Sequence, residues 1–268
     1  MVPQHPEGFV ALVGAGPGCA DLLTLRALRL LARAEVVVHD GLVDPDVLDL
    51  APPGALRISV AKERDRHTLP QREIEALLVS HARAGRFVVR LKGGDPFIFG
   101  RGGEEVEALG AAGIPHEVVP GVSAALGCAA EARLPLTHRA LSSAVTFVAG
   151  TCQGLRDQDW RGLAGPGRTL VVYMGVSTAA AIADKLIADG VAPDMPVAIL
   201  ERGTRPGARA MRTLLADMGD AVARAGVTSP ALLVVGRVAA LADAEDLLGP
   251  AWAEALQAAG APALGDAA

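Results

Sequence analysis

The sequence predicts an α/β fold made of two α/β domains. Short apolar runs that end in glycine or a polar turn alternate with longer segments of helical periodicity, as in parallel sheets covered by helices. This alternation occurs in two series, separated by a stretch without clear periodicity at residues 133–143. The chain has 268 residues, of which 51% are hydrophobic, so two cores are possible. We expect an N-terminal domain at 1–138, a C-terminal domain at 139–248 and an Ala/Pro-rich tail at 249–268.

The first series opens with a strand at 9–14, FVALVG, which is apolar and ends in glycine. A helix is expected within 21–35, because apolar residues recur at helical spacing and Asp21 or Thr24 can cap its start. The remaining elements of this half are strands at 35–40, 55–61, 86–94 and 116–121, with helices at about 71–84 and 103–112.

The second series repeats the same alternation. Its apolar runs are again short and followed by glycine or charged residues, which predicts buried strands. The expected elements are strands at 144–150, 169–175, 196–203 and 231–238, and a helix at 178–189.

Charge and hydropathy exclude several classes of function. The formal net charge is -5, which gives the whole chain no electrostatic reason to bind nucleic acid or an anionic membrane. The apolar stretch at 22–38 is interrupted by three arginines, too often for a membrane span or a secretory signal. We therefore expect a soluble cytoplasmic protein.

The cysteines and histidines show no metal-binding pattern. Cys19, Cys128 and Cys152 lie far apart, and we expect them to be small buried apolar residues. The six histidines form no HxxxH or HExxH arrangement. We therefore expect no metal.

The motif GAGPG at 14–18 lies between a strand and a helix, where backbone amides hold ligands in α/β proteins. A dinucleotide fingerprint is one interpretation, with Asp40 as the ribose-binding carboxylate. However, Cys19 stands where that fingerprint needs a third glycine, and Pro17 lacks an amide proton. A purely structural tight turn is another interpretation.

A second glycine-rich stretch, LKGGDPFIFGRGG at 91–103, follows an apolar strand. Gly93 and Gly94 allow the backbone to approach a ligand closely, and Asp95 before proline is biased toward extended geometry. The GKS or GKT ending of a P-loop is missing. The alternative is a glycine-rich helix entry, in which the helix dipole stabilises Glu104 and Glu105 in the first turn.

Basic residues gather in three places: KERDRH at 62–67 with Arg72, His138-Arg139, and ERGTRPGARAMR at 201–212. Such runs are usually solvated faces, with about 0.2–1 kcal/mol for each exposed ion pair. If they surround a cleft, they could bind a polycarboxylate.

Taken together, these motifs resemble the uroporphyrinogen-III C-methyltransferases of the tetrapyrrole methylase family, class III S-adenosylmethionine-dependent methyltransferases. The resemblance covers roughly residues 9–240, in family order and spacing, and GDPFIFGRGGEE is specific to this branch. It implies two α/β domains with a cofactor cleft between them. The matching runs are VGAGPG, LLTLRALRLL, VVVHDGLV, RLKGGDPFIFGRGGEE, IPHEVVPGVSAA, LPLTH, VVYMGV, MPVAILERGT and SPALLVVGRV.

The resemblance also implies functional residues in this chain. Asp40 and Lys62 fall on the family's proton acceptor and proton donor. The cofactor is S-adenosyl-L-methionine, with S-adenosyl-L-homocysteine as its product, and no metal is implied. The implied cofactor contacts are Pro17, Gly93, Gly94, Asp95, Ile98, Ser123, Ala124, Met174 and Gly203.

Two departures from the family pattern touch the expected substrate edge. Gly41 stands where the family usually has arginine, and AKERDRH replaces the usual GKR segment. Arg64 or Arg66 could supply the missing cation. Together with Arg101 of the glycine-rich stretch, they are our candidates for substrate binding.

The implied reaction is methylation of uroporphyrinogen III at C-2 and C-7 to give precorrin-2, the branch point toward sirohaem and cobalamin. The resemblance also implies a homodimer and, from the matched motifs, a stand-alone methyltransferase. Alternatives are a methylase acting on a later precorrin, a catalytically inactive cofactor-binding homologue and, from the GAGPG turn, a nicotinamide dehydrogenase.

Overall fold

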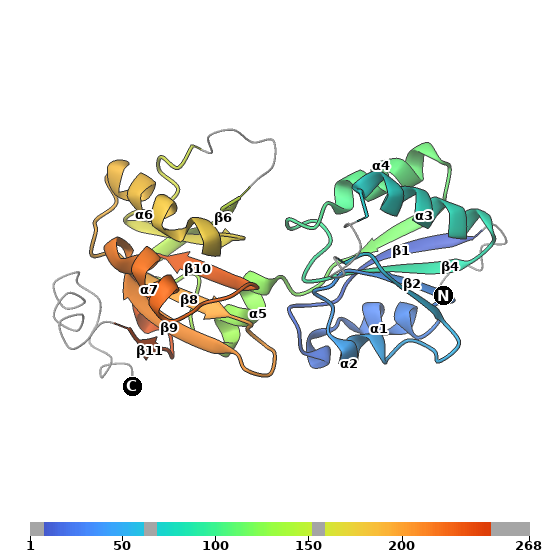
Figure 1. Cartoon of the computed structure of the whole chain (residues 1–268), viewed down its shortest axis with the longest axis horizontal. Coiled ribbons are helices and arrows are strands. Elements are labelled where there is room, and N and C mark those ends of the chain that lie inside the picture. Colours follow the sequence, from blue (N-terminus) through green and yellow to red (C-terminus); the bar gives the residue numbers. More distant parts are fainter. Residues whose placement is uncertain (1–7, 62–68, 152–158, 248–268) are drawn as a thin grey trace. The chain divides into compact units, whose positions relative to one another are not determined.

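The chain forms two compact units, residues 1–127 and 128–268, in a computed structural model that describes residues 8–61, 69–151 and 159–247 (Figure 1). The division falls inside helix α5 (Ala124–Glu131), earlier than the expected boundary at 138–139. Residues after this point belong to the second unit because they bond to it: Asp243 N donates to Ala132 O at 2.8 Å. The expected tail lies outside the described residues.

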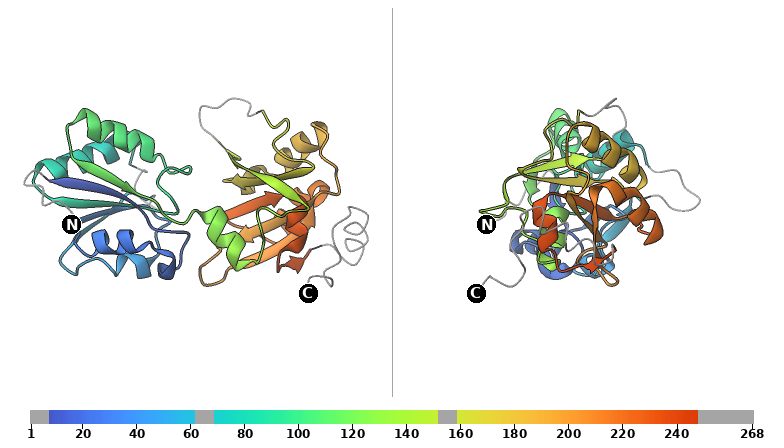
Figure 2. Two further views of the ribbon diagram at one scale, coloured as in Figure 1. Left: turned by 180° about the vertical axis from the view of Figure 1, so that it is seen from behind. Right: turned by 90° about the vertical axis from the view of Figure 1, so that its left-hand side faces the viewer.

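The first unit is built on a five-stranded sheet whose neighbouring strands are all parallel, in the order β3-β2-β4-β1-β5. Helices α1 and α2 lie over one face and α3 and α4 over the other (Figures 1 and 2). The strands are β1 (Phe9–Gly14), β2 (Val36–His39), β3 (Leu56–Ser59), β4 (Phe87–Lys92) and β5 (His116–Val119). The helices are α1 (Leu25–Leu31), α2 (Pro45–Leu48), α3 (Gln71–Arg83) and α4 (Gly102–Ala111), with a 3-10 turn at Ala20–Leu22.

Alternation along the strands explains why both faces of this sheet are covered. Odd-numbered residues of β1 pack with Leu30 of α1, and even-numbered residues pack with Leu78 of α3. In β4, Val88 belongs to the α3 side. Arg90 and Lys92, two and four residues later, therefore face α3 and α4 as well.

The start of α1 follows one of the two predicted caps. The Thr24 hydroxyl accepts a hydrogen bond from Ala27 N at 3.1 Å, which satisfies one of the free amides of the first turn. The helix is shorter than expected, because Ala20–Leu22 forms a separate 3-10 turn before it.

The second unit contains a six-stranded mixed sheet in the order β11-β9-β8-β10-β7-β6. Only β6–β7 and β11–β9 are parallel pairs, and the three central pairings are antiparallel. The strands are β6 (Ser142–Ala149), β7 (Gly167–Tyr173), β8 (Pro196–Glu201), β9 (Arg209–Leu214), β10 (Ala231–Val235) and β11 (Glu245–Asp246). The helices are α6 (Ala179–Ala188) and α7 (Met218–Arg224), with 3-10 turns at Val176–Thr178, Leu215–Asp217 and Arg237–Leu241.

The structure confirms the α/β class and corrects two expectations. Parallel sheets were expected throughout, but only the first unit's sheet is fully parallel. The basic run at 201–212 was expected to be a solvated face or to bind a polycarboxylate; instead it contains β9, which pairs with β8, and the β9 arginines are held by carboxylates on neighbouring strands. Among the described helices, none combines the length and the apolar character that crossing a bilayer requires.

Candidate active site

Three loops follow neighbouring strands at the carboxyl-terminal edge of the first unit's sheet, where ligands bind in open parallel sheets. Backbone hydrogen bonds join two of them. Ala15 N donates to Lys92 O at 2.7 Å. Gly94 N donates to Gly16 O at 2.7 Å, and Gly16 N donates back to Gly94 O at 3.2 Å. The loops are GAGPG after β1, residues 93–101 after β4 and residues 120–123 after β5.

The third loop touches the other two through bare backbone. A Cβ atom on Gly121 would lie 2.2 Å from Gly94 O and 2.8 Å from Gly14 Cα. Any side chain there would force the loops apart, so glycine is required by the close approach. The glycines of this edge thus create a continuous backbone surface.

Asp95 has a structural role that the sequence did not predict. One carboxylate oxygen accepts a hydrogen bond from Phe97 N at 2.9 Å, and the other accepts one from Gly121 N at 3.0 Å. The carboxylate therefore ties the β4 loop to the β5 loop. We therefore expect the backbone around Asp95, rather than its carboxylate, to contact a ligand.

The other first-unit residues expected to contact the cofactor lie in the same loops. Gly93 and Ile98 are half-buried, Ser123 is buried, and Ala124 begins α5. Pro17 is buried beside Gly127, where an added Cβ would lie 2.4 Å from Pro17 Cγ. The structure brings these residues to one edge of one sheet; their contact with a cofactor stays a prediction.

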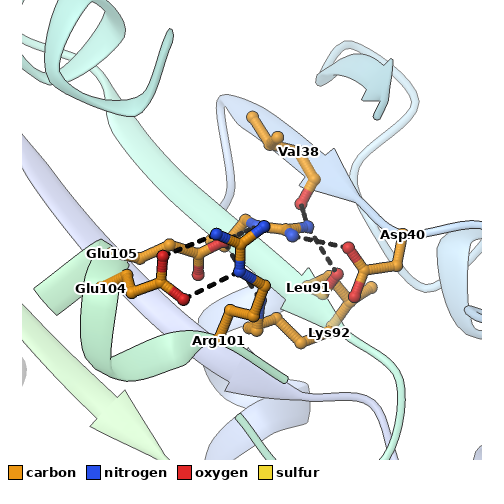
Figure 3. Close-up of polar contacts among 8 residues, drawn as sticks. Val38, Asp40, Leu91, Lys92, Arg101, Glu104 and Glu105 are labelled. Carbon is orange, nitrogen blue, oxygen red and sulfur yellow. Dashed lines mark hydrogen bonds and ion pairs between the residues drawn. The ribbon is translucent and has the colours of Figure 1, made fainter. Parts of the chain in front are cut away.

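Asp40 directly follows β2 and ends a network of buried charges (Figure 3). Its Oδ1 accepts a hydrogen bond from Arg90 Nη2 at 2.5 Å. Arg90 Nε donates to Glu105 Oε1 at 2.9 Å, and Lys92 Nζ donates to the same oxygen at 3.1 Å. The side chains of Arg90, Lys92 and Glu105 are 3%, 2% and 0% exposed, whereas that of Asp40 is 30% exposed. Asp40 is therefore the solvent-facing end of the network.

Sequence analysis missed the buried members of this network. Arg90 and Lys92 are basic residues inside the apolar strand FVVRLK, which is the signal that could have found them. Burial lowers the pKa of Lys92, and the Arg90 charge lowers it further, while Glu105 and Asp40 oppose both effects. A buried ammonium of this kind remains only when anions are close to it.

Gly41, which stands beside Asp40 where the family usually has arginine, lies next to Ala61 in the structure. A Cβ on Gly41 would lie 2.8 Å from the Ala61 Cβ, which is closer than two carbon atoms normally approach. The parallel register of β2 and β3 brings these two positions together. A side chain at position 41 would therefore require a shift of Ala61 or of the Gly41 backbone. Lys62, Arg64 and Arg66, predicted for catalysis or substrate binding, lie outside the described residues.

Arg101, the third candidate for substrate binding, is exposed and forms a two-point ion pair with Glu104. Arg101 Nε lies 2.8 Å from Glu104 Oε1, and Nη2 lies 2.6 Å from Oε2. The hydrogen bonds that Arg101 donates to Glu104 raise the pKa of Arg101 and lower the pKa of Glu104. Both groups stay charged at neutral pH, Arg101 at the end of the loop that carries the expected cofactor contacts and Glu104 in the first turn of α4.

In the second unit, the expected residues Met174 and Gly203 follow strands β7 and β8. Met174 is exposed. Gly203 is buried against Cys128, because a Cβ on it would lie 2.5 Å from Cys128 Sγ. Burial raises the pKa of the Cys128 thiol to about 11. Cys128 thus packs as expected, whereas Cys19 is exposed, against expectation.

Left-handed backbone at non-glycine residues is concentrated in the loops that carry the predicted sites. Such conformations cost about 1–3 kcal/mol and often accompany function. The φ angles are 53° for Phe99, 58° for Arg101, 55° for Met174, 53° for Arg202 and 63° for Thr204. Within the described ranges, no three His, Cys, Asp or Glu side chains come together as a metal site.

Comparison with known proteins identifies related sequences. The family model Tetrapyrrole (Corrin/Porphyrin) Methylases matches residues 10–219. A siroheme synthase from Gluconacetobacter diazotrophicus is 53% identical over 234 residues, which are 86% of this chain and 50% of that protein. A siroheme synthase from Methylococcus capsulatus is 52% identical over 236 residues, 87% of this chain and 50% of that protein. The chain thus spans about half the length of these curated relatives.

Solved structures show the same fold. Uroporphyrin-III C-methyl transferase from Thermus thermophilus, complexed with S-adenosylhomocysteine, matches with a TM-score of 0.76 and 44% identity, covering 87% of this chain and 94% of that chain. A cobalt precorrin-4 methyltransferase matches with a TM-score of 0.77 and 26% identity, covering 89% of this chain and 99% of that chain.

Proposed function

Because the chain belongs to the tetrapyrrole methylase family, we propose that it is an S-adenosylmethionine-dependent methyltransferase that converts uroporphyrinogen III to precorrin-2 by methylation at C-2 and C-7. The main support is its 44% identity, over 87% of the chain, to the uroporphyrin-III C-methyl transferase crystallised with S-adenosylhomocysteine. We assign only the methyl-transfer step to these residues, since the siroheme synthases are about twice as long as the matched region.

The loops of the first unit fit such a cofactor. Their backbone is bare at Gly93 and Gly94, and Asp95 holds the β4 loop to the β5 loop. Backbone amides and carbonyls are therefore free of bulky side chains along this edge. We propose that these residues bind the cofactor together with Pro17, Ile98, Ser123 and Ala124, and that Met174 and Gly203 contribute from the second unit. When bound, S-adenosylmethionine supplies an electrophilic methyl group.

The side chains of the chain then position the substrate and remove a proton. An electron-rich reduced macrocycle needs no protein nucleophile, so orientation of the two reactants can supply about 7–11 kcal/mol of the barrier. After methylation, a ring proton must leave. We propose that Asp40, whose side chain is 30% exposed, accepts it: the carboxylate forms the new O–H bond as the bond from the ring to hydrogen breaks. The proton-donor role of Lys62 stays a proposal from the resemblance.

An isotope experiment tests this function directly. The purified protein is incubated without oxygen with uroporphyrinogen III and methyl-labelled S-adenosylmethionine, and the tetrapyrrole products are weighed by mass spectrometry. We expect a gain of two labelled methyl groups. Unchanged tetrapyrrole mass, with S-adenosylhomocysteine still bound in calorimetry, would reject the reaction while keeping the cofactor site.

A later precorrin is the second candidate substrate. It is favoured by the TM-score of 0.77 with the cobalt precorrin-4 methyltransferase, but the identity to that protein is only 26%. Incubation with cobalt precorrin-4 in place of uroporphyrinogen III separates the two substrates. We also propose that the protein is a cytoplasmic homodimer, which cell fractionation and light scattering of the purified protein would test.

A further inference from the structure

The charged network that ends at Asp40 is deeply buried. Arg90 and Lys92 project from β4 and Glu105 from the first turn of α4, all at 3% exposure or less. Burying ionised groups is costly, and an ion pair in the interior is often no more stabilising than apolar residues of the same size. Stability alone therefore does not explain why the chain buries these charges.

Arg90 is the centre of the network and has no freedom to rotate. Its Nε donates to Glu105 Oε1 at 2.9 Å, and its Nη1 lies 3.4 Å from the carbonyl oxygens of Val38 and Leu91. A planar guanidinium held at both ends presents its remaining donor in a fixed direction. That donor is Nη2, which holds Asp40 Oδ1 at 2.5 Å (Figure 3).

Glu105 holds Arg90 in this position, and Lys92 holds Glu105. Both cations donate to a single oxygen of Glu105, at 2.9 and 3.1 Å. With all four side chains ionised, the two positive charges are balanced by Glu105 and Asp40. Asp40 is therefore needed for electrical neutrality, and it is also the member at 30% exposure.

We propose that Arg90 is a positioning residue for methyl transfer, which fixes the Asp40 carboxylate through one oxygen and leaves its exposed part to the substrate, with Glu105 holding the guanidinium and Lys92 holding Glu105. This inference rests on the proposed function. A displacement of about 1 Å can cost a factor of about 10² in rate. Lysine at position 90 keeps the charge but cannot reach Glu105 and Asp40 together in this geometry.

The test is a double-mutant cycle with Arg90→Lys and Asp40→Asn, measured as kcat and KM for uroporphyrinogen III and as the dissociation constant of S-adenosylhomocysteine. We expect Arg90→Lys to lower kcat about 10- to 100-fold. KM and the dissociation constant should stay within about threefold, and the same substitution should have no further effect on kcat in the Asp40→Asn background. A residue that only stabilises the fold would act equally in both backgrounds.

Arg86→Lys is the matched control, because Arg86 precedes the same strand and pairs with Glu35 at 3.1 Å on the surface. It should leave kcat unchanged. Asp40→Glu is the second variant. It keeps the charge at the solvent-facing end of the network and displaces the carboxylate by one methylene group. We expect at least a tenfold loss of kcat from it.

The outcomes separate this inference from the proposed function. A wild-type protein that transfers no methyl group to uroporphyrinogen III overturns the proposed function, and the inference with it. If the wild type is active, the inference alone is overturned when Arg90→Lys keeps full kcat. It is also overturned when Arg90→Lys lowers kcat by the same factor in the wild-type and Asp40→Asn backgrounds. If Arg90→Lys does not fold, full activity of Asp40→Glu overturns it.

Discussion

Each unit buries a glutamate beside an arginine, but the two glutamates are satisfied differently. Glu201 Oε1 accepts hydrogen bonds from Thr228 N at 2.7 Å and Thr228 Oγ1 at 2.8 Å, and Oε2 accepts one from Arg209 Nε at 2.6 Å. Glu105 receives both of its cations on Oε1, and its Oε2 has no hydrogen-bond partner within the described residues.

The difference separates a group that is satisfied internally from one that ends at the carboxylate proposed to be catalytic. The Glu201 group is complete without a ligand and joins β8 to β9 and to the turn before β10. The Glu105 group leads through Arg90 to Asp40, whose side chain is half-buried and reaches solvent at the loop-bearing edge of its sheet. Buried charge that ends at an accessible carboxylate is therefore a better guide to the site than buried charge alone.

The largest effect on stability is expected from Glu105→Gln. It leaves Arg90 and Lys92 buried with one anion fewer, and breaking a buried pair costs about 3–5 kcal/mol. Glu104→Gln, the neighbouring exposed residue, should cost only about 0–1 kcal/mol. Hydrogen exchange of first-unit amides measures the loss of stability in each variant. Tryptophan fluorescence would not report on the first unit, because both tryptophans belong to the second unit. Equal losses for the two variants would contradict the buried network.

A smaller effect, about 1–3 kcal/mol at neutral pH, is expected from Glu201→Gln, because an amide nitrogen would then oppose Thr228 or Arg209. Burial raises the pKa of Glu201, but hydrogen bonds from Thr228 and Arg209 outweigh it and lower the pKa below the ordinary 4.5. The carboxylate therefore contributes stability above pH 4.5, which is lost as the pH falls through the lowered pKa.

Tryptophan fluorescence during urea unfolding measures this difference across pH, because Trp160 is buried in the second unit's core. The gap between the wild type and Glu201→Gln should narrow below pH 4.5. Glu245→Gln, on the exposed strand β11, is the control and should show no such narrowing. A gap that widens on acidification would mean that the sign of the pKa shift is wrong.

The smallest effect concerns Gly41 and Ala61. Gly41→Ala should cost about 1 kcal/mol, the lower end for overpacking because Gly41 is exposed. Ala61→Gly in the same chain should recover most of it, because the 2.8 Å approach is then removed. Hydrogen exchange at the ends of β2 and β3 reports the coupling. Strictly additive costs would show that the two positions are independent.

The sequence predicted the loops better than the network behind them. The prolines in GAGPG and GGDP restrict the backbone and the glycines permit tight turns, so the position of these loops after β1 and β4 could be predicted directly. Helix α3 (Gln71–Arg83) also matches its expected range of 71–84, because its apolar period is strong. The role of Arg90 depends on which face of β4 meets α4, and that contact is not local in sequence.

The second unit shows the same limit. In the sequence, Arg209 and Arg212 belong to a run of basic residues typical of a solvated face. In the structure β9 pairs with β8, and Glu201 and Asp246 hold the two arginines. Antiparallel and parallel strands share the same short apolar runs, so local patterns do not distinguish them. Likewise, the Gly41–Ala61 contact follows from the pairing of β2 with β3.

The most direct measurement is the turnover number of Asp40→Asn at saturating uroporphyrinogen III and S-adenosylmethionine. If the open network serves proton removal, the turnover number should fall about 10²- to 10⁴-fold, while S-adenosylhomocysteine binds as tightly as to the wild type. Wild-type turnover in a folded Asp40→Asn protein would contradict the assignment of this network to the reaction.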